Sequence, residues 1–220
     1  MFRAWAIVLI WYDSCFKDTL HYNIISMDDL NLKGPKFKIC VSGAAETSHC
    51  AVDALDKAKE LGREIIRQGA ILVTGATTGF PYWSAIGAKE EKGLSIGVSP
   101  ASSEREHIEK YNLPIDYFDT IIYTSAGFSA RNLLLTRASD AVIVGCGRMG
   151  TLNEFTIAFE DNKPIGVLTE SGGMADEIKE IVEKAHRGQG KIVYDSDPKT
   201  LVKKVLELVQ LEKEDGREIS

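Results

Sequence analysis

Short apolar runs alternate with amphipathic helical patterns from residue 36 onward, and this alternation constrains the fold more than any other feature of the sequence. Runs that are apolar throughout are typical of strands in a parallel sheet that helices cover on both faces. The sequence therefore predicts an α/β fold, a Rossmann-like, doubly wound and mostly parallel sheet of about seven strands, in a single domain over residues 36–210. The expected strands are Phe37–Ser42, Ala70–Val73, Leu94–Val98, Thr120–Tyr123, Ala141–Val144, Pro164–Leu168 and Lys191–Tyr194.

Several helical patterns have recognisable ends. Ser103 and Glu106 form a capping-box pair at the start of a short helix. Asp197 and Pro198 are typical of the start of the last helix. We expect that helix to end near residue 210, because residues 211–220 are charged and predict a fraying tail.

Residues 1–35 differ in character and are interpreted as an N-terminal extension outside the core. Their apolar run, Ala4–Tyr12, is too short to span a bilayer. A signal peptide is disfavoured, because the residues that follow, Tyr12–Cys15, do not resemble a cleavage site of small residues. The alternative interpretation is an amphipathic segment that binds a partner. Neither interpretation involves a membrane.

The charge balance bears on the class of partner. The formal net charge is −6 at pH 7, whereas nucleic-acid-binding proteins usually carry a basic patch or stripe. We therefore expect no nucleic acid among the partners. A small phosphorylated ligand is compatible with this charge, because a local site does not depend on the charge of the whole chain.

The cysteines and histidines form no metal-binding or redox motif in the sequence. No two cysteines have the spacing of a zinc pair or of a C-x-x-C motif, and His49, His107 and His186 are isolated. We expect no metal site, no disulfide scaffold and a reducing, cytoplasmic location. The four cysteines are Cys15, Cys40, Cys50 and Cys146.

Four turns that follow expected strands are rich in glycine, serine and threonine. The carboxyl ends of parallel strands meet at one edge of the sheet, where α/β proteins bind their ligands. Glycines allow close backbone approach, and a helix that begins after such a turn offers unpaired N–H groups to an anion. The four turns are Gly43–Ser48, Thr74–Pro81, Ser125–Arg131 and Gly145–Thr151. The expected ligand contacts are Gly43, Gly75, Thr77, Thr78, Gly79, Ser125, Asn132, Gly147, Arg148, Gly150 and Thr151.

Two stretches carry a family resemblance. Arg131-Asn132, followed by the run G-R-M-G-T-L-N-E over Gly147–Glu154, resembles the LOG family, once described as lysine-decarboxylase-like. That family has an arginine in an M-H-x-R-K-like element and a P-G-G-x-G-T-x-x-E motif. The run Thr74–Pro100, which ends G-L-S-I-G-V-S-P, is similar to the branch that includes the molybdenum-cofactor carrier proteins.

The resemblance implies hydrolysis of the N-glycosidic bond of a nucleoside 5′-monophosphate, which releases free base and ribose 5-phosphate. By motif position, Arg131 and Glu154 would be the catalytic pair, and the glycine turn with Thr151 would hold the phosphate. Hydrolysis would require no cofactor. The alternative is a non-catalytic carrier or sensor of a nucleotide-like cofactor. The family also implies a homodimer or a higher homo-oligomer.

The chain departs from the family motif at two positions. Cys146 stands where the family has proline, and we expect it to pack inertly. Arg148 replaces the second glycine of the motif, so it either blocks backbone approach to phosphate or adds a cation for a more anionic ligand. Glu154 has a purely structural interpretation as well, because Thr151–Glu154 matches a capping box. Arg131 is either the partner of an anion or a solvated side chain near a helix start.

Overall fold

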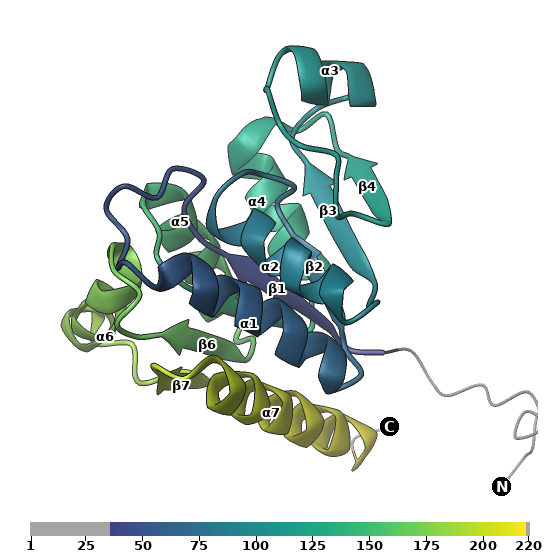
Figure 1. Cartoon of the computed structure of the whole chain (residues 1–220). Coiled ribbons are helices and arrows are strands. Elements are labelled where there is room, and N and C mark those ends of the chain that lie inside the picture. The colour runs from purple at the N-terminus through teal and green to yellow at the C-terminus, as the bar shows by residue number, and fades with distance from the viewer. Residues whose placement is uncertain (1–35, 219–220) are drawn as a thin grey trace, which may run out of the picture. The chain divides into compact units, whose positions relative to one another are not determined.

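Figure 1 shows the computed structural model of the chain, which describes residues 36–218, and within this range seven strands alternate with seven helices. The interpretations of residues 1–35 lie outside the described residues. The elements in chain order are β1 (Lys38–Ser42), α1 (Ala54–Arg67), β2 (Ile71–Thr74), α2 (Phe80–Glu90), β3 (Ser95–Ser99), α3 (Glu104–Glu109), β4 (Thr120–Tyr123), α4 (Gly127–Ala138), β5 (Ala141–Val144), α5 (Met149–Glu160), β6 (Ile165–Leu168), α6 (Met174–Ala185), β7 (Ile192–Asp195) and α7 (Pro198–Glu218).

The strands of the described chain form one parallel sheet in the order β4-β3-β2-β1-β5-β6-β7. This arrangement confirms the predicted doubly wound α/β fold. The order runs outward in both directions from β1, so β1 and β5 are neighbours at the point where the strand order reverses. Ser42 of β1 is aligned with Val144 of β5 at their carboxyl ends. Ligands of open α/β sheets bind at such a point.

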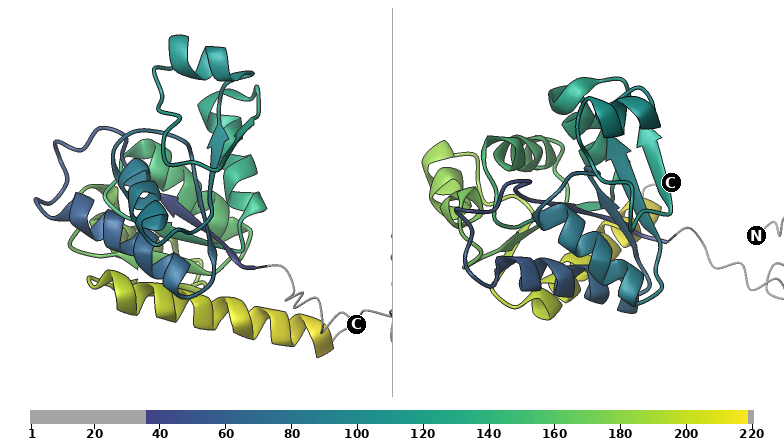
Figure 2. Two further views of the ribbon diagram at one scale, coloured as in Figure 1. Left: turned by 45° about the vertical axis from the view of Figure 1, so that its right-hand side comes forward. Right: turned by 45° about the horizontal axis from the view of Figure 1, so that its top comes forward.

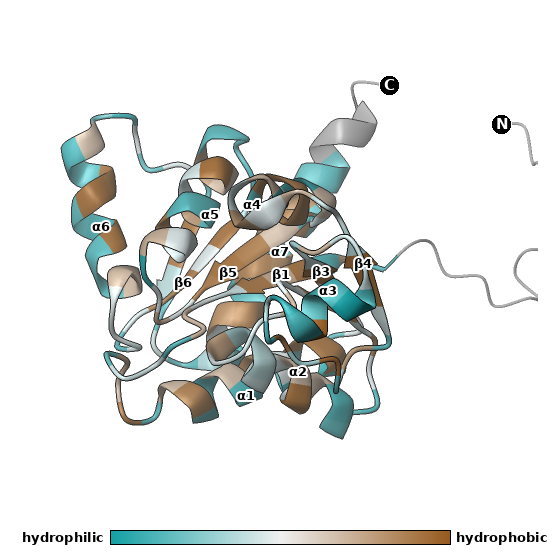
Figure 3. Cartoon of the chain, turned by 90° about the horizontal axis from the view of Figure 1, so that it is seen from above, coloured by the Kyte–Doolittle hydropathy of each residue, from teal (hydrophilic) through white to brown (hydrophobic). Residues whose placement is uncertain are grey.

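Helices cover both faces of the sheet, as the two views of Figure 2 show. On one face, Leu61 of α1 and Val205 of α7 are buried in the same core cluster as Ile39 of β1. On the other face, Leu135 of α4 is buried in a second cluster with Cys40 of β1. Successive residues of β1 therefore enter opposite cores, as the two-residue period of a strand requires. Figure 3 shows the apolar sheet between its two helical layers.

Two helix starts agree with the sequence predictions. At α3, the backbone N–H of Glu106 donates to Ser103 Oγ at 3.2 Å. At α7, the backbone N–H of Thr200 donates to Asp197 Oδ2 at 2.9 Å. In both cases a side-chain oxygen satisfies an N–H group that has no partner inside the helix.

The end of α7 differs from the prediction. The helix continues to Glu218, so the charged segment that starts at Leu211 is helical where the sequence predicted a fraying tail. Glu212 forms an ion pair with Lys191, which lies just before β7. This contact joins distant parts of the sequence, and no local pattern predicts it. No helix in the described part of the chain is both long enough and apolar enough to cross a membrane.

Candidate functional site

A pocket of about 220 Å³ lies at the carboxyl ends of β1 and β5. The β1–α1 turn, the β2–α2 turn and the first turns of α4 and α5 contribute to its lining. These are the turns that the sequence placed at the ligand-binding edge. The predicted site residues that line the pocket are Gly43, Gly75, Thr77, Arg131, Asn132, Arg148, Gly150, Thr151 and Glu154.

A buried ion pair lies in the pocket wall. Arg131 Nη1 donates to Glu154 Oε1 at 3.0 Å, and both side chains are more than nine-tenths buried. Ser42, the last residue of β1, donates from its hydroxyl to Glu154 Oε2. The Asn132 amide lies on the same side, and with its nitrogen turned toward the pair it donates to Glu154 Oε1 at 3.0 Å. Residues of β1 and α4 therefore converge on one carboxylate of α5.

Burial dominates the titration of that carboxylate. Removal from water raises the pKa of Glu154, while the charge of Arg131 and the hydroxyl of Ser42 act in the opposite direction. Arg131 Nε is buried without a hydrogen-bond partner among the described residues. Its guanidinium carbon lies 5.9 Å from the centre of the Phe128 ring. A buried N–H group without a partner in a pocket wall is a candidate ligand contact.

Gly75 makes room for Arg131. A Cβ atom at this position would lie 2.2 Å from Arg131 Nη1, so any other residue would displace the guanidinium. Two further glycines make room for the buried ring of Phe80: a Cβ at Gly43 would lie 2.5 Å from its Cδ1, and a Cβ at Gly145 would lie 2.1 Å from its Cζ. These three glycines are needed for packing beneath the pocket, whereas the sequence interpretation assigned Gly43 and Gly75 to the ligand.

The first turn of α5 is open toward the pocket. Apart from its chain neighbours and the backbone of α5 itself, a Cβ added at Gly150 would have no described atom within 4 Å, and Gly150 lines the pocket. The N–H groups of a first helical turn have no partner inside the helix and attract anions. The capping-box interpretation of Thr151 is wrong, because α5 begins at Met149 and Glu154 contacts Ser42 and Arg131 instead of the helix start.

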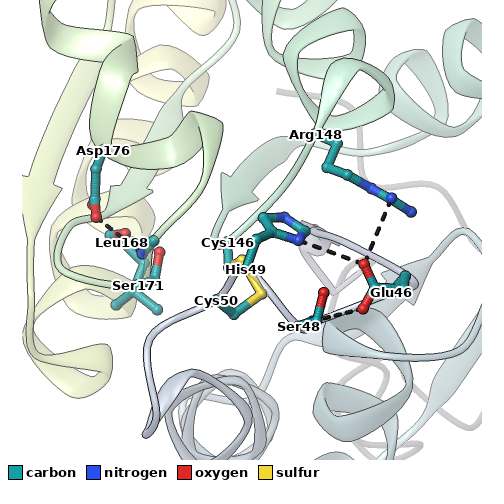
Figure 4. Close-up of a disulfide and its surroundings, with 10 residues drawn as sticks. Glu46, Ser48, His49, Cys50, Cys146, Arg148, Leu168, Ser171 and Asp176 are labelled. Atoms are coloured by element: carbon teal, nitrogen blue, oxygen red, sulfur yellow. Dashed lines mark hydrogen bonds and ion pairs between the residues drawn. A yellow bond between two sulfur atoms is a disulfide. The ribbon is translucent and has the colours of Figure 1, made fainter.

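Arg148 lies at the rim of the pocket and pairs with Glu46 of the β1–α1 loop. Its Nη1 lies 3.6 Å from Glu46 Oε2, and both side chains are more than half exposed. Figure 4 shows the guanidinium directed toward Glu46. Arg148 therefore adds a cation at the rim and leaves Gly150 uncovered. Of the two alternatives for this position, the geometry favours the additional cation.

Four predicted contacts do not line the pocket. Thr78 Oγ1 donates to the Ala45 carbonyl at 3.1 Å. Gly79 is the N-cap of α2 with φ +68°, and a Cβ there would lie 2.3 Å from the Ala44 carbonyl oxygen. The Ser125 N–H donates to the Ala101 carbonyl at 2.9 Å. A Cβ at Gly147 would lie 2.3 Å from the Thr151 side chain. All four residues contribute to the packing of their loops. The composition of a turn does not show whether a residue packs in the loop or contacts a ligand. Those residues are Thr78, Gly79, Ser125 and Gly147.

Sequence reasoning missed Ser42 and Phe128 as parts of the site. Ser42 is almost fully buried beside Glu154, and Phe128 is 49% exposed at the pocket. A signal for Ser42 exists in the sequence, because a hydroxyl ends an otherwise apolar strand. No comparable signal marks Phe128.

The cysteine predictions require correction. Cys50 and Cys146 form a disulfide across 96 residues, so Cys146 is not an isolated thiol packed inertly. His49 is not isolated either, because it lies beside both sulfur atoms. Cys40, buried in the sheet, is a free thiol. The two cysteines can pair because β1 and β5 are neighbours in the sheet. The spacing of the cysteines along the chain does not reveal this.

The comparisons with known proteins agree with this architecture. A model of the SLOG cluster4 family matches residues 36–202, so the chain belongs to the SLOG cluster4 family. This confirms the predicted LOG-like relationship. An uncharacterised protein of Archaeoglobus fulgidus is 33% identical over 131 residues, which cover 60% of this chain and 79% of the relative.

Two solved structures belong to the branch that the sequence resembled. The molybdenum cofactor carrier protein of Chlamydomonas reinhardtii is 26% identical with a TM-score of 0.62, and the match covers 80% of this chain and 99% of that one. The molybdenum cofactor binding protein of Rippkaea orientalis is 27% identical with a TM-score of 0.60, and the match covers 81% of this chain and 97% of that one.

A third structure corrects the prediction about nucleic acid. DNA processing protein A of Helicobacter pylori, described as binding single-stranded DNA, is 20% identical with a TM-score of 0.53 over 78% of this chain and 80% of that one. At this identity the likeness shows the fold alone. The exclusion of nucleic acid was wrong, because it relied on net charge, and proteins of this fold include a DNA binder. A local surface decides phosphate binding, and net charge does not report on it.

Proposed function

We propose that the pocket binds a phosphate-bearing, nucleotide-like ligand and that the protein acts as a carrier of it, in the manner of the molybdenum cofactor carriers. The observation that carries the proposal is the open first turn of α5 at the pocket, where Gly150 is uncovered. Its N–H groups and helix dipole favour an anion. A cytoplasmic location belongs to the same proposal and is tested by cell fractionation.

The other walls suit the remaining parts of such a ligand. The volume of about 220 Å³ is smaller than most sites for drug-sized ligands, which occupy roughly 300–1,000 Å³. The enclosed part would therefore hold the phosphate and its adjoining sugar or ring. Phe128, 49% exposed, offers an aromatic face to a planar ring at the mouth. Arg148 adds a cation beside the phosphate site.

The state of Glu154 favours a carrier over a hydrolase. Stabilising the positive charge of an oxocarbenium-like transition state requires an ionised carboxylate near the sugar. Here Arg131 and Ser42 engage both oxygens of Glu154, and burial raises its pKa. The hydrolase is the second candidate function. The raised pKa of Glu154 also supports the hydrolase, because carboxyl groups with a shifted pKa in pockets are often catalytic.

One experiment separates the two candidates. The full chain is titrated by calorimetry with AMP, GMP, CMP and UMP and with molybdenum cofactor released from a molybdoenzyme, while chromatography measures free base. We expect saturable binding of at least one ligand without base release. Base release that Glu154→Gln abolishes and Glu160→Gln preserves would establish the hydrolase. Absence of saturable binding for every ligand would exclude both functions.

A further inference from the structure

Three potential metal ligands meet beside the pocket without being part of it. His49 and Cys50 lie in the β1–α1 loop, and Cys146 follows β5. A ring nitrogen of His49 and the two sulfur atoms all lie within 4.8 Å of one another. Figure 4 shows the imidazole beside the disulfide that joins the two cysteines. In the described chain, this is the one group of three such ligands that the fold brings together.

Reduction of the disulfide would turn this trio into a zinc-type ligand set. Thiolate and imidazole are the ligands that Zn²⁺ prefers, and two cysteines with one histidine leave a fourth tetrahedral position open. With Zn–S bonds of about 2.3 Å, two thiolates in a tetrahedral site lie roughly 3.8 Å apart. The Cα atoms of Cys50 and Cys146 are 5.5 Å apart, so side-chain rotation reaches that separation with the backbone in place.

Backbone contacts hold the ligand-bearing loops independently of the disulfide. The N–H of Ala44 donates to the Cys146 carbonyl at 2.6 Å, and the N–H of Ala51 donates to the Ser171 carbonyl at 3.0 Å. An antiparallel bridge joins Cys50 to Gly172. The loops therefore keep the trio together when the sulfur atoms are reduced. Such pre-organisation lowers the cost of binding a metal ion.

The charged groups around the trio are compatible with a cation. Glu46 Oε2 lies 3.7 Å from His49 Nδ1, so a carboxylate stands next to the imidazole. Arg148 pairs with the same carboxylate at 3.6 Å and offsets its charge. The charge that attracts the cation would come mainly from the two thiolates. Cys146 is buried and Cys50 is half-buried, whereas His49 is exposed and gives access from solvent.

We propose that the reduced protein binds one Zn²⁺ ion through His49, Cys50 and Cys146, and that oxidation by a peroxide releases it. In the oxidation each thiolate loses one electron and the S–S bond forms. The O–O bond of the peroxide breaks, and two protons from solvent complete its reduction; hydrogen peroxide yields two water molecules. Because formation of the disulfide removes both thiolate ligands, Zn²⁺ is released, and its charge is unchanged since the electrons come from the thiolates. The disulfide of the present structure corresponds to the oxidised state in this proposal.

The test uses Co²⁺ as a spectroscopic substitute for Zn²⁺. The full chain is reduced with a phosphine, kept free of oxygen and titrated with Co²⁺, and the thiolate-to-cobalt charge-transfer band is followed. We expect saturation at one ion per chain and displacement of Co²⁺ by an equivalent of Zn²⁺. Addition of hydrogen peroxide should abolish the band and remove two titratable thiols. A reduced chain that shows no thiolate-to-cobalt band would overturn the proposal.

Matched variants identify the ligands. Cys50→Ser should abolish the band, and His49→Ala should weaken cobalt affinity at least about tenfold. Cys40→Ala and His186→Asn, which change a cysteine and a histidine outside the trio, should bind as the unchanged chain does. A band that survives Cys50→Ser contradicts the assignment. Circular dichroism confirms that each variant is folded, and the oxidised unchanged chain provides a folded protein that should not bind the ion.

Discussion

Two arginine–glutamate pairs, one in the wall of the pocket and one at its rim, differ in their exposure to water. In the inner pair, Arg131 and Glu154 are 6% and 8% exposed at their side chains and lie 3.0 Å apart. In the outer pair, Arg148 and Glu46 are 58% and 52% exposed and lie 3.6 Å apart. The residue types are the same, so the environment accounts for their different roles.

The difference shows what burial does to a charged pair. Inside the protein, neither partner can be removed without leaving an unsatisfied charge, although the intact pair adds little net stability. At the surface, water and salt replace a lost partner at small cost. The inner pair should therefore be needed for folding and the shape of the pocket, whereas the outer pair should adjust ligand affinity alone.

Removal of the inner cation should have the largest effect. Arg131→Ala leaves the Glu154 carboxyl buried without its ion pair, and we expect the free energy of unfolding to fall by about 3–5 kcal/mol. Urea denaturation measures the change. The control is Arg137→Ala in the same helix, which removes an exposed pair with Asp161 and should change stability little. Equal losses in the two variants would show that burial does not distinguish these pairs.

A methyl group at Gly75 should break the inner pair by crowding. Gly75→Ala places a Cβ 2.2 Å from Arg131 Nη1, and overpacking of this kind costs about 1–3 kcal/mol. Thermal unfolding measures the loss. Gly150→Ala is the matched control, because its Cβ would meet no described atom outside its chain neighbours and the α5 backbone within 4 Å. It should leave stability unchanged or slightly higher, because alanine is favoured over glycine in a helix, and it should weaken binding of a phosphate ligand. A stable Gly75→Ala chain would mean that Arg131 moves without cost.

The pH dependence of stability should report on Glu154. Because burial raises its pKa above 4.5 in the folded state, the folded chain binds more protons than the unfolded chain over a window above that pH. Its contribution to stability is therefore complete below about pH 4.5 and decreases as pH rises through the raised pKa. Glu154→Gln should flatten this decrease, measured by urea unfolding between about pH 5 and pH 8. If the slope of stability against pH were unchanged in this variant, another group would bind the proton. The control is Glu160→Gln in the same helix.

Changes to the outer pair should affect binding and barely affect stability. Arg148→Ala should leave the unfolding midpoint unchanged, weaken an anionic ligand and reduce the salt dependence of its affinity. Glu46→Gln should strengthen the same ligand, because it frees the Arg148 guanidinium. Calorimetry at two salt concentrations measures both. If Glu46→Gln weakened the ligand as much as Arg148→Ala, the pair would act as a unit that positions the loop.

Most of the fold was predictable because it depends on local patterns. Apolar runs such as Ala141–Val144 predicted buried parallel strands, and the capping pair of Ser103 and Glu106 predicted the start of α3. The location of the pocket was predictable as well, because parallel strands bring their following turns to one edge. The roles of single residues in those turns were less predictable: Gly75 accommodates an arginine, and Ser125 does not line the pocket.

The sequence by itself determined the order and type of the elements and the edge of the sheet at which the pocket lies, since hydrophobic periodicity and turn composition are local properties. Only the tertiary structure decided which side chains meet. It placed β1 next to β5, so that Ser42 contacts Glu154, and Cys50 bonds to Cys146 across 96 residues. It also made one arginine–glutamate pair internal and left the other in water. Contacts of this kind depend on the strand order and on burial. Neither can be read from the spacing of residues along the chain.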